Sequence, residues 1–165
     1  RKLVFHLRKD EDSALVKMFN RMGEYIIEDL ERVGIQCTIE RYSHAETLRL
    51  ENLKKCDLYI SRWMADTGDP DNFLQPLFSP DNVSNGTRYN NATVNEKMAL
   101  AQGMVHPGKR AQLYKEIQEI IVDDAPWIFL VHPQWAVASR KGLSGLNMSC
   151  LGLIKLEDIM IDKQK

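Results

Sequence analysis

The sequence lacks several features that mark particular classes of protein. Its 165 residues contain no apolar run that approaches the length needed to span a membrane, which is about 18 residues. Its three cysteines, Cys37, Cys56 and Cys150, form no Cys-x-x-Cys pair and have no Cys/His spacing for zinc. Each lies in an apolar stretch, where a free cysteine is typically a small buried side chain. The net charge of −1 gives no basic excess to neutralise phosphates, so we expect no nucleic-acid partner.

Composition and length instead favour a globular domain. Hydrophobic residues make up 44% of the chain and charged residues 27%, and we find no internal repeat. The chain has neither a starting methionine nor a signal peptide, and "RKLVFHLRKDED" resembles an interrupted strand. We therefore expect an excised piece of a longer protein, with residues 1–165 forming a single α/β lobe.

The first part of the sequence alternates between strand-like and helix-like patterns. Apolar residues at helical spacing predict a helix over 13–34, with Ser13 or Asp12 at its start and Gly34 at its end. The other predicted elements are strands at 2–8, 35–42 and 56–63 and a short helix at 45–55. The order β-α-β-α-β indicates an α/β layer with largely parallel strands.

The second part is predicted to be mainly helical. The stretch 79–91 is a loop rich in turn formers, and Thr93 and Glu96 form a capping box for the helix that follows. A strong helix over 106–126 has Pro107 near its start and Pro126 just past its end. Two further strands are predicted, one at 127–143 that breaks at Pro133 and one in the tail 151–165 that lacks a partner.

The most informative stretch is "SRWMADTGDPDNF", residues 61–73, which crowds three aspartates beside a tryptophan. Gly68 and Pro70 place these acids on a turn, with no nucleophile or base that would make a catalytic pair. The spacing also fails the calcium-loop pattern in both registers, which leaves no metal site. Turn and cap chemistry remains open for the later acids, with Asp71 or Asn72 capping the next helix.

Asp66 differs from the other acids because it directly follows the predicted strand. Loops beyond the carboxyl ends of parallel strands line the crevice of an α/β sheet. A carboxylate beside the indole of Trp63 there suits a cationic or ammonium-bearing ligand. The alternative is that Trp63 belongs to the core and Asp66 is a helix cap.

Three stretches carry a resemblance to a known family: "DLYISRWMADTGDPDNFLQPLF", "RYNNATVNEKM" and "HPGKRAQLYKEIQEIIVDDAPWIFLVHP". With them, the sequence resembles the extracytoplasmic solute-binding proteins of peptide and nickel ABC transporters, the dipeptide/oligopeptide-binding family, over essentially its whole length. It departs from the family at Asn95, where an acid is usual. Full members are also considerably longer and have two lobes. The resemblance therefore implies the C-terminal lobe of a two-lobed, type II periplasmic-binding-protein-like fold, a mixed sheet flanked by helices, with the N-terminal lobe absent.

The resemblance implies a function that is not enzymatic. The protein would capture oligopeptides or dipeptides outside the membrane, in the periplasm or as a membrane-anchored lipoprotein, and deliver them to the transmembrane subunits of an ABC permease. No cofactor is implied. Alternatives are the same fold binding a metal chelate, haem or an oligosaccharide, or a ligand-sensing module of a regulator.

The resemblance also implies roles for the residues of the loop. Asp66 would hold the N-terminal ammonium of the peptide. The residues that would line the pocket with it are Trp63, Met64 and Ala65. The residues that would support the shape of the loop without touching ligand are Gly68, Asp69, Pro70 and Asp71.

Overall fold

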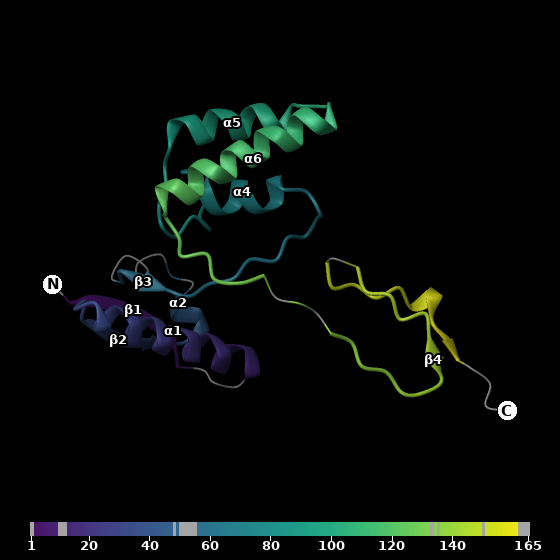
Figure 1. Cartoon of the computed structure of the whole chain (residues 1–165), viewed down its shortest axis with the longest axis horizontal. Helices are drawn as coiled ribbons and strands as arrows, with labels where there is room; N and C mark the ends of the chain where they lie inside the picture. Colours follow the sequence, from purple (N-terminus) through teal and green to yellow (C-terminus); the bar gives the residue numbers. More distant parts are fainter. Residues whose placement is uncertain are drawn as a thin grey trace. The chain divides into compact units, whose positions relative to one another are not determined.

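The computed structural model describes residues 2–9, 13–47, 49, 56–132, 134, 136–149 and 151–161 (Figure 1). The chain divides into two compact units, Arg1–Arg62 and Trp63–Lys165. The prediction of a single lobe concerns how these units assemble, and it stays a prediction.

The first unit is built on a three-stranded parallel sheet. Its strands are β1 (Leu3–Arg8), β2 (Cys37–Tyr42) and β3 (Leu58–Tyr59), in the order β2-β1-β3. Leu3 pairs with Cys37 at one end of the ladder, and Phe5 pairs with Leu58 on the other side of β1. The parallel arrangement confirms the predicted α/β layer. The strand predicted at 56–63 is shorter than expected, since only two of its residues join the ladder.

Helix α1 (Ala14–Arg32) follows β1 and begins where the sequence predicts. The Ser13 hydroxyl accepts a hydrogen bond from the Val16 N–H at 3.2 Å, which caps one of the free donors of the first turn. Gly34 has a φ of +84°, the left-handed conformation that commonly follows a helix end. Ser13 and Gly34 are therefore confirmed as the boundaries of this helix.

One face of α1 packs closely against β1. Phe5, Leu7 and Ile27 form the buried core of the unit. A Cβ at Gly23 would lie 2.4 Å from Cδ2 of Leu7, so the absence of a side chain allows the helix to approach the sheet. Of the helix predicted at 45–55, the structure describes α2 (His44–Thr47), and residues 48 and 50–55 lie outside the described residues.

His6 alternates with Phe5 and Leu7 along β1 and is also buried, with 3% exposure. Neither ring nitrogen has a hydrogen-bond partner among the residues that the structure describes. Its Nε2 lies 3.6 Å from a carboxylate oxygen of Glu40, and its ring lies 4.3 Å from that of Tyr42. Burial lowers the pKa of His6, and the Glu40 carboxylate offsets part of that shift. The imidazole is therefore favoured in its neutral form.

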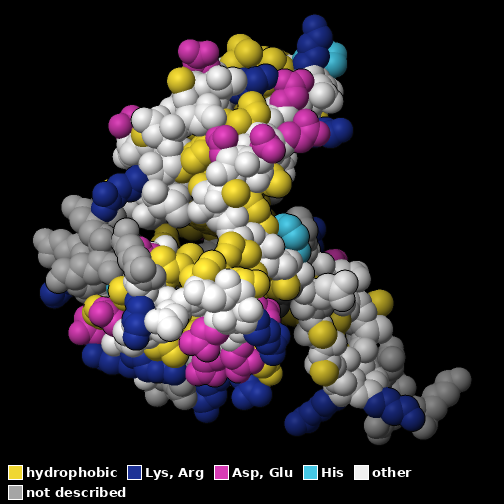
Figure 2. Space-filling view, turned by 60° about the vertical axis from the view of Figure 1, so that its left-hand side comes forward, with side chains coloured by type: hydrophobic (Ala, Val, Ile, Leu, Met, Phe, Trp, Pro, Cys, Tyr) yellow, Lys and Arg dark blue, Asp and Glu magenta, His cyan; other side chains and the backbone are white. Residues whose placement is uncertain are grey.

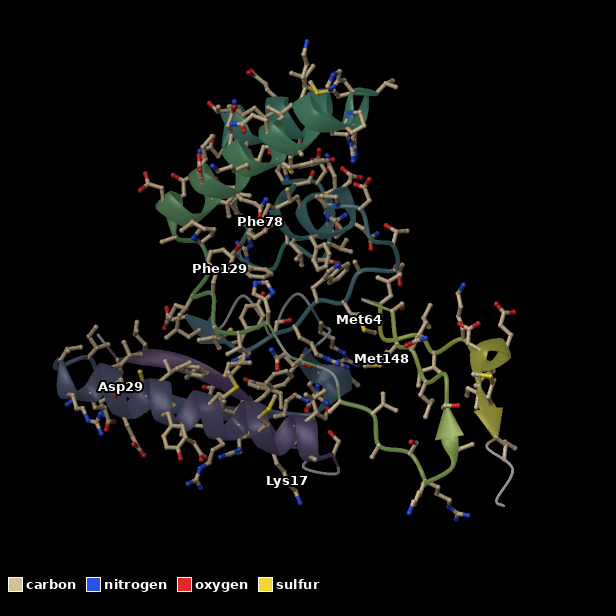
Figure 3. All side chains as sticks on the ribbon, turned by 45° about the vertical axis from the view of Figure 1, so that its right-hand side comes forward. Lys17, Asp29, Met64, Phe78, Phe129 and Met148 are labelled. Atoms are coloured by element: carbon tan, nitrogen blue, oxygen red, sulfur yellow. The ribbon has the colours of Figure 1, made fainter. Side chains whose placement is uncertain are left out.

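In the described part of the second unit, three α-helices share one core: α4 (Asp71–Phe78), α5 (Ala92–Gln102) and α6 (Pro107–Asp124). A short 3-10 helix, η1 (Leu156–Asp158), lies in the C-terminal part. The fully buried side chains at its centre are Val94, Met98, Ile117 and Ile121. Partly buried Trp127 packs against this cluster, with its ring 5.0 Å from that of Phe78. Figure 3 labels Phe78, which lies at the end of α4.

The helix ends of this unit correct one prediction and confirm another. The cap of α5 is Asn91, whose side chain accepts from the Val94 N–H at 3.2 Å, so the capping box predicted at Thr93 and Glu96 is wrong. The helix begins two residues earlier than that box requires. Pro107 does occupy the first turn of α6, as predicted, because its missing N–H costs nothing there.

The loop at 79–91 is organised around one buried side chain, Asn85, which is 4% exposed. Its Nδ2 donates to the carbonyls of Ser79 (3.0 Å) and Tyr89 (2.8 Å). Its Oδ1 accepts from the Tyr89 N–H (3.0 Å) and the Thr87 hydroxyl (3.3 Å). The polar loop therefore has a centre of its own, formed by hydrogen bonds.

The C-terminal part of the chain is mostly extended. No described residue between 127 and 140 joins a strand, which contradicts the strand predicted at 127–143 except at its last residue. β4 (Leu143–Ser144) pairs antiparallel with β5 (Met160–Ile161), so the predicted tail strand has a partner within the chain. Among the described strands, none joins this pair to the parallel sheet.

Surface charge follows the balanced composition. On the face that Figure 2 shows, Asp and Glu side chains lie beside Lys and Arg side chains. Within the described residues, no helix is both long enough and apolar enough to cross a membrane.

Candidate ligand-binding loop

The loop that leads into α4 belongs to the second unit and turns three side chains outward. Trp63 is 36% exposed, Met64 is 58% exposed, and Asp66 is also exposed. Ala65 between them is buried, with 6% exposure, so the chain turns one side chain inward at this point. Figure 3 labels Met64 on this loop.

Asp69 is held by a paired interaction with α6. The guanidinium of Arg110 donates from Nη1 to Oδ2 at 2.8 Å and from Nη2 to Oδ1 at 2.9 Å, a bidentate geometry. The N–H of Asp71 also donates to Oδ1 of Asp69, at 2.8 Å. The hydrogen bonds from Arg110, followed by the one from the Asp71 backbone, lower the pKa of Asp69. Asp69 is therefore occupied with supporting the loop.

Arg110 connects this acid to two helices. Its Nε donates to the Ala101 carbonyl of α5 at 3.0 Å, and its Nη2 donates to the Tyr114 hydroxyl at 2.9 Å. The guanidinium also lies over the Tyr114 ring, 4.7 Å from its centroid, at a distance typical of cation–π contact. Sequence reasoning about the loop did not include Arg110, because its partner lies 41 positions away.

Asp71 also faces the helices. Its Oδ2 accepts from Nε2 of Gln102 at 3.3 Å, and its Oδ1 lies 3.5 Å from the Tyr114 hydroxyl. The prediction that Asp71 or Asn72 caps α4 is wrong: the residue at the cap position is Pro70, whose ring has no polar atom that could accept a hydrogen bond. The role expected of Asp71 is taken by Asp69, which accepts from the Asp71 N–H.

Asp66 is the acid of this loop with an uncommitted carboxylate. Within the described part of the chain, its carboxylate makes no hydrogen bond or ion pair, whereas its N–H donates to Oδ1 of Asn72 at 2.6 Å. Trp63 donates from Nε1 to the Asn72 carbonyl at 2.8 Å and belongs to neither core cluster. The alternative of a core tryptophan with a capping aspartate is therefore not what the structure has.

The arrangement offers one exposed anionic group beside an exposed indole. The supporting contacts turn away from that pair, since Asp69 and Asp71 both face α5 and α6. Among the described residues, no group of three or more His, Cys, Asp or Glu side chains is placed to hold a metal ion. The chemistry available at this loop is therefore the binding of a cationic group, through a charge-assisted hydrogen bond.

The candidate loop lies within the part of the chain that matches a known protein family. Residues 15–85 match the family model described as "Bacterial extracellular solute-binding proteins, family 5 Middle". The chain is 35% identical over 144 residues to Heme-binding protein A of Haemophilus influenzae, covering 86% of this chain and 26% of that protein. It is 30% identical over 145 residues to Di/tripeptide-binding protein 2 of Pseudomonas aeruginosa, covering 86% of this chain and 27% of that protein.

The fold is similar to that of the ABC transporter-associated periplasmic binding protein DppA from Helicobacter pylori in complex with peptide STSA. The TM-score is 0.78 at 24% identity, covering 98% of this chain and 31% of that one. The α/β architecture thus matches part of a periplasmic binding-protein fold, and the chain spans about a quarter of the length of the curated relatives it matches. Members of the family bind solutes and are not enzymes. The chain belongs to family 5 of the bacterial extracellular solute-binding proteins, the solute-binding proteins of peptide and nickel ABC transporters.

Proposed function

We propose that the protein captures dipeptides or oligopeptides outside the membrane for an ABC importer, and that Asp66 binds the peptide's N-terminal ammonium. The observation that carries this proposal is the difference between the three acids of the loop. Asp69 and Asp71 are engaged with Arg110 and Gln102, whereas the carboxylate of Asp66 is exposed and uncommitted. Relatives at about 30% identity that bear the names di/tripeptide-binding protein and dipeptide-binding protein support the peptide as ligand.

The physical basis is a charge pair formed out of water. A hydrogen bond to a charged group contributes about 1.5–3 kcal/mol net when it is shielded. The exposed indole of Trp63 supplies a flat apolar wall beside the pair, and Met64 supplies an adaptable one. Side chains of the peptide would be accepted loosely, because the fixed recognition is of its ammonium group.

Closure would complete the site. We infer that this chain contributes the C-terminal lobe of a two-lobed receptor and that an N-terminal lobe closes over the ligand by hinge motion. Water exclusion on closure strengthens the pairing of Asp66 with the ammonium. The closed receptor would then dock on the transmembrane permease subunits, from the periplasm or from a lipid anchor on the outer face of the cytoplasmic membrane.

The test uses the full-length protein and its thermal unfolding in the presence of short peptides. A pool of di- and tripeptides is compared with the same pool after N-acetylation, which removes the ammonium. A ligand at about 100 times its dissociation constant adds about 2.7 kcal/mol of stability, which is readily seen as a shift in Tm. We expect stabilisation by the free-amine pool only.

Two variants then test the role of Asp66. Asp66→Asn removes the carboxylate, and Asp81→Asn removes the same charge from another exposed acid of the second unit. We expect the first to abolish the response to free-amine peptides and the second to retain it. Equal responses to both pools in the wild type would preserve peptide binding but refute the ammonium site. No response to either pool would refute peptide binding.

Haem is the second candidate ligand, because the relative at 35% identity bears the name Heme-binding protein A. It is tested by titrating the full-length protein with haemin and following the Soret absorbance. Saturable binding of haemin, together with no response to either peptide pool, would replace the peptide proposal with this one.

A further inference from the structure

We infer that Asn72 is a positioning residue that fixes the orientation of Asp66 toward the ligand. This inference rests on the proposed peptide-binding function and assigns a role to a residue outside the Trp63–Asp66 segment. Asn72 would not touch the ligand. It would act through the backbone of the residue that does.

The first observation is that Asn72 bonds to both of the proposed ligand-contacting groups. Its Oδ1 accepts from the Asp66 N–H at 2.6 Å, and its main-chain carbonyl accepts from Nε1 of Trp63 at 2.8 Å. One residue therefore sets the peptide plane before Asp66 and the plane of the indole.

The second observation is that Asn72 stands on a rigid element. It lies in the first turn of α4, whose buried residues Leu74, Leu77 and Phe78 belong to the core of the second unit. Sites held by residues of a packed helix are more precise than sites held within a loop. The packing of α4 therefore fixes the position of Asn72, and with it the loop, relative to the core of the second unit.

The third observation is that nothing else directs the carboxylate of Asp66. That carboxylate has no partner in the described part of the chain, so the backbone, which sets the Cα–Cβ direction, decides which positions its oxygens can reach. The preceding residue, Ala65, is buried, and the hydrogen bond that the Asp66 N–H makes in the described part of the chain is the one to Asn72. Asp69 cannot replace it, because its oxygens are bonded to Arg110 and to the Asp71 N–H.

These contacts predict a selective defect. Asn72→Ala removes the side-chain acceptor for Asp66 but retains the main-chain carbonyl that holds Trp63. Recognition of the ammonium should therefore weaken more than the contacts that an acetylated peptide also makes. Asn72→Asp retains an oxygen that can accept from the Asp66 N–H, so it should preserve the recognition.

The experiment measures dissociation constants of the full-length protein for trialanine and for N-acetyl-trialanine by calorimetry. The readout is the dissociation constant for N-acetyl-trialanine divided by that for trialanine. This ratio is a property of the folded protein and is not changed by a loss of global stability. The matched control is Asn82→Ala, since Oδ1 of Asn82 likewise accepts a hydrogen bond from a backbone N–H, that of Ser84, in the next loop. Asp66→Asn serves as the reference for complete loss of ammonium recognition.

We expect Asn72→Ala to lower the ratio by about tenfold or more, as the misdirection of one charge-assisted hydrogen bond predicts. Asn72→Asp should keep the ratio at or above that of the wild type, and Asn82→Ala should leave it unchanged. If Asp66→Asn loses the discrimination but Asn72→Ala keeps it, the positioning role is overturned while the peptide proposal stands. An equal fall in Asn72→Asp and Asn72→Ala would also overturn it. A wild-type protein that does not discriminate refutes the peptide–ammonium proposal and this inference together.

Discussion

Replacing Asn85 by alanine should destabilise the second unit far more than its position in a polar loop suggests. The side chain is buried and makes four hydrogen bonds, two as donor and two as acceptor. In Asn85→Ala, three main-chain groups lose their bond to this side chain: the carbonyl of Ser79, which keeps a bond from the Asn82 N–H, and the carbonyl and N–H of Tyr89. The loop between α4 and α5 would lose its centre.

The size of the effect follows from those three groups. A hydrogen bond contributes about 1 kcal/mol net, and more when its loss leaves a buried group unsatisfied. We therefore expect Asn85→Ala to lower the free energy of unfolding by about 3 kcal/mol. In the described part of the chain, the side chain of exposed Asn82 makes one hydrogen bond, which it accepts from the Ser84 N–H. Asn82→Ala should therefore lower the free energy of unfolding by no more than about 0.5 kcal/mol.

The assay is urea unfolding of the chain, followed by circular dichroism. Asn85→Asp adds a second test, because it keeps both acceptor bonds but turns a charge toward two carbonyls. Those carbonyls favour the protonated form and raise the pKa of the new carboxyl, so its deficit relative to the wild type should narrow as the pH falls. A loss in Asn85→Ala no greater than that in Asn82→Ala would refute the reasoning.

Two further predictions concern titratable groups. Arg110 lowers the pKa of Asp69 below 3.8, so the stability that this carboxylate contributes is present above that pH and is lost as the pH falls through the lowered value. The deficit in Tm of Asp69→Asn should therefore shrink at acid pH, and a deficit independent of pH would contradict the pairing. Burial lowers the pKa of His6 below 6.5, so the unfolded chain takes up the proton first and stability falls as the pH drops below 6.5. His6→Leu should remove that pH dependence. It should not lower the free energy of unfolding at pH 7.5, since neither ring nitrogen is hydrogen-bonded within the described residues. Urea unfolding at pH 7.5 and pH 5 measures both effects, and a variant that is less stable than the wild type at pH 7.5 would contradict this reasoning.

The sequence predicted the elements whose signals are local. The helix α1 has its cap at Ser13 and its end at Gly34, and both signals lie within one turn of the boundary. The strand predicted at 127–143 failed for the opposite reason. Its apolar residues, such as Ile128 and Val131, satisfy a strand pattern, but a strand requires a partner that composition cannot supply.

The sequence located the candidate loop but did not predict the hydrogen bonds that its acids make. Position after a strand singled out Asp66, and the structure leaves its carboxylate exposed. The partners of the other acids could not be read from the sequence, because Arg110 and Gln102 reach them from distant helices. Asn72 matched the pattern of a helix cap, yet its side-chain oxygen accepts a hydrogen bond from the Asp66 N–H, which precedes the helix.

The place of β1 at the centre of its sheet has a consequence for how the protein folds. β1 precedes both of its partners, since Leu3 pairs with Cys37 and Phe5 with Leu58. At about 5–20 residues synthesised per second, the strand leaves the ribosome roughly 3–10 seconds before the sheet can close. The neighbouring helices α5 and α6 need no such delay, because contacts between adjacent elements form early. Within this unit, α1 is the element that can cover the apolar strand before β2 and β3 have been synthesised, and Gly23 allows the two to pack closely.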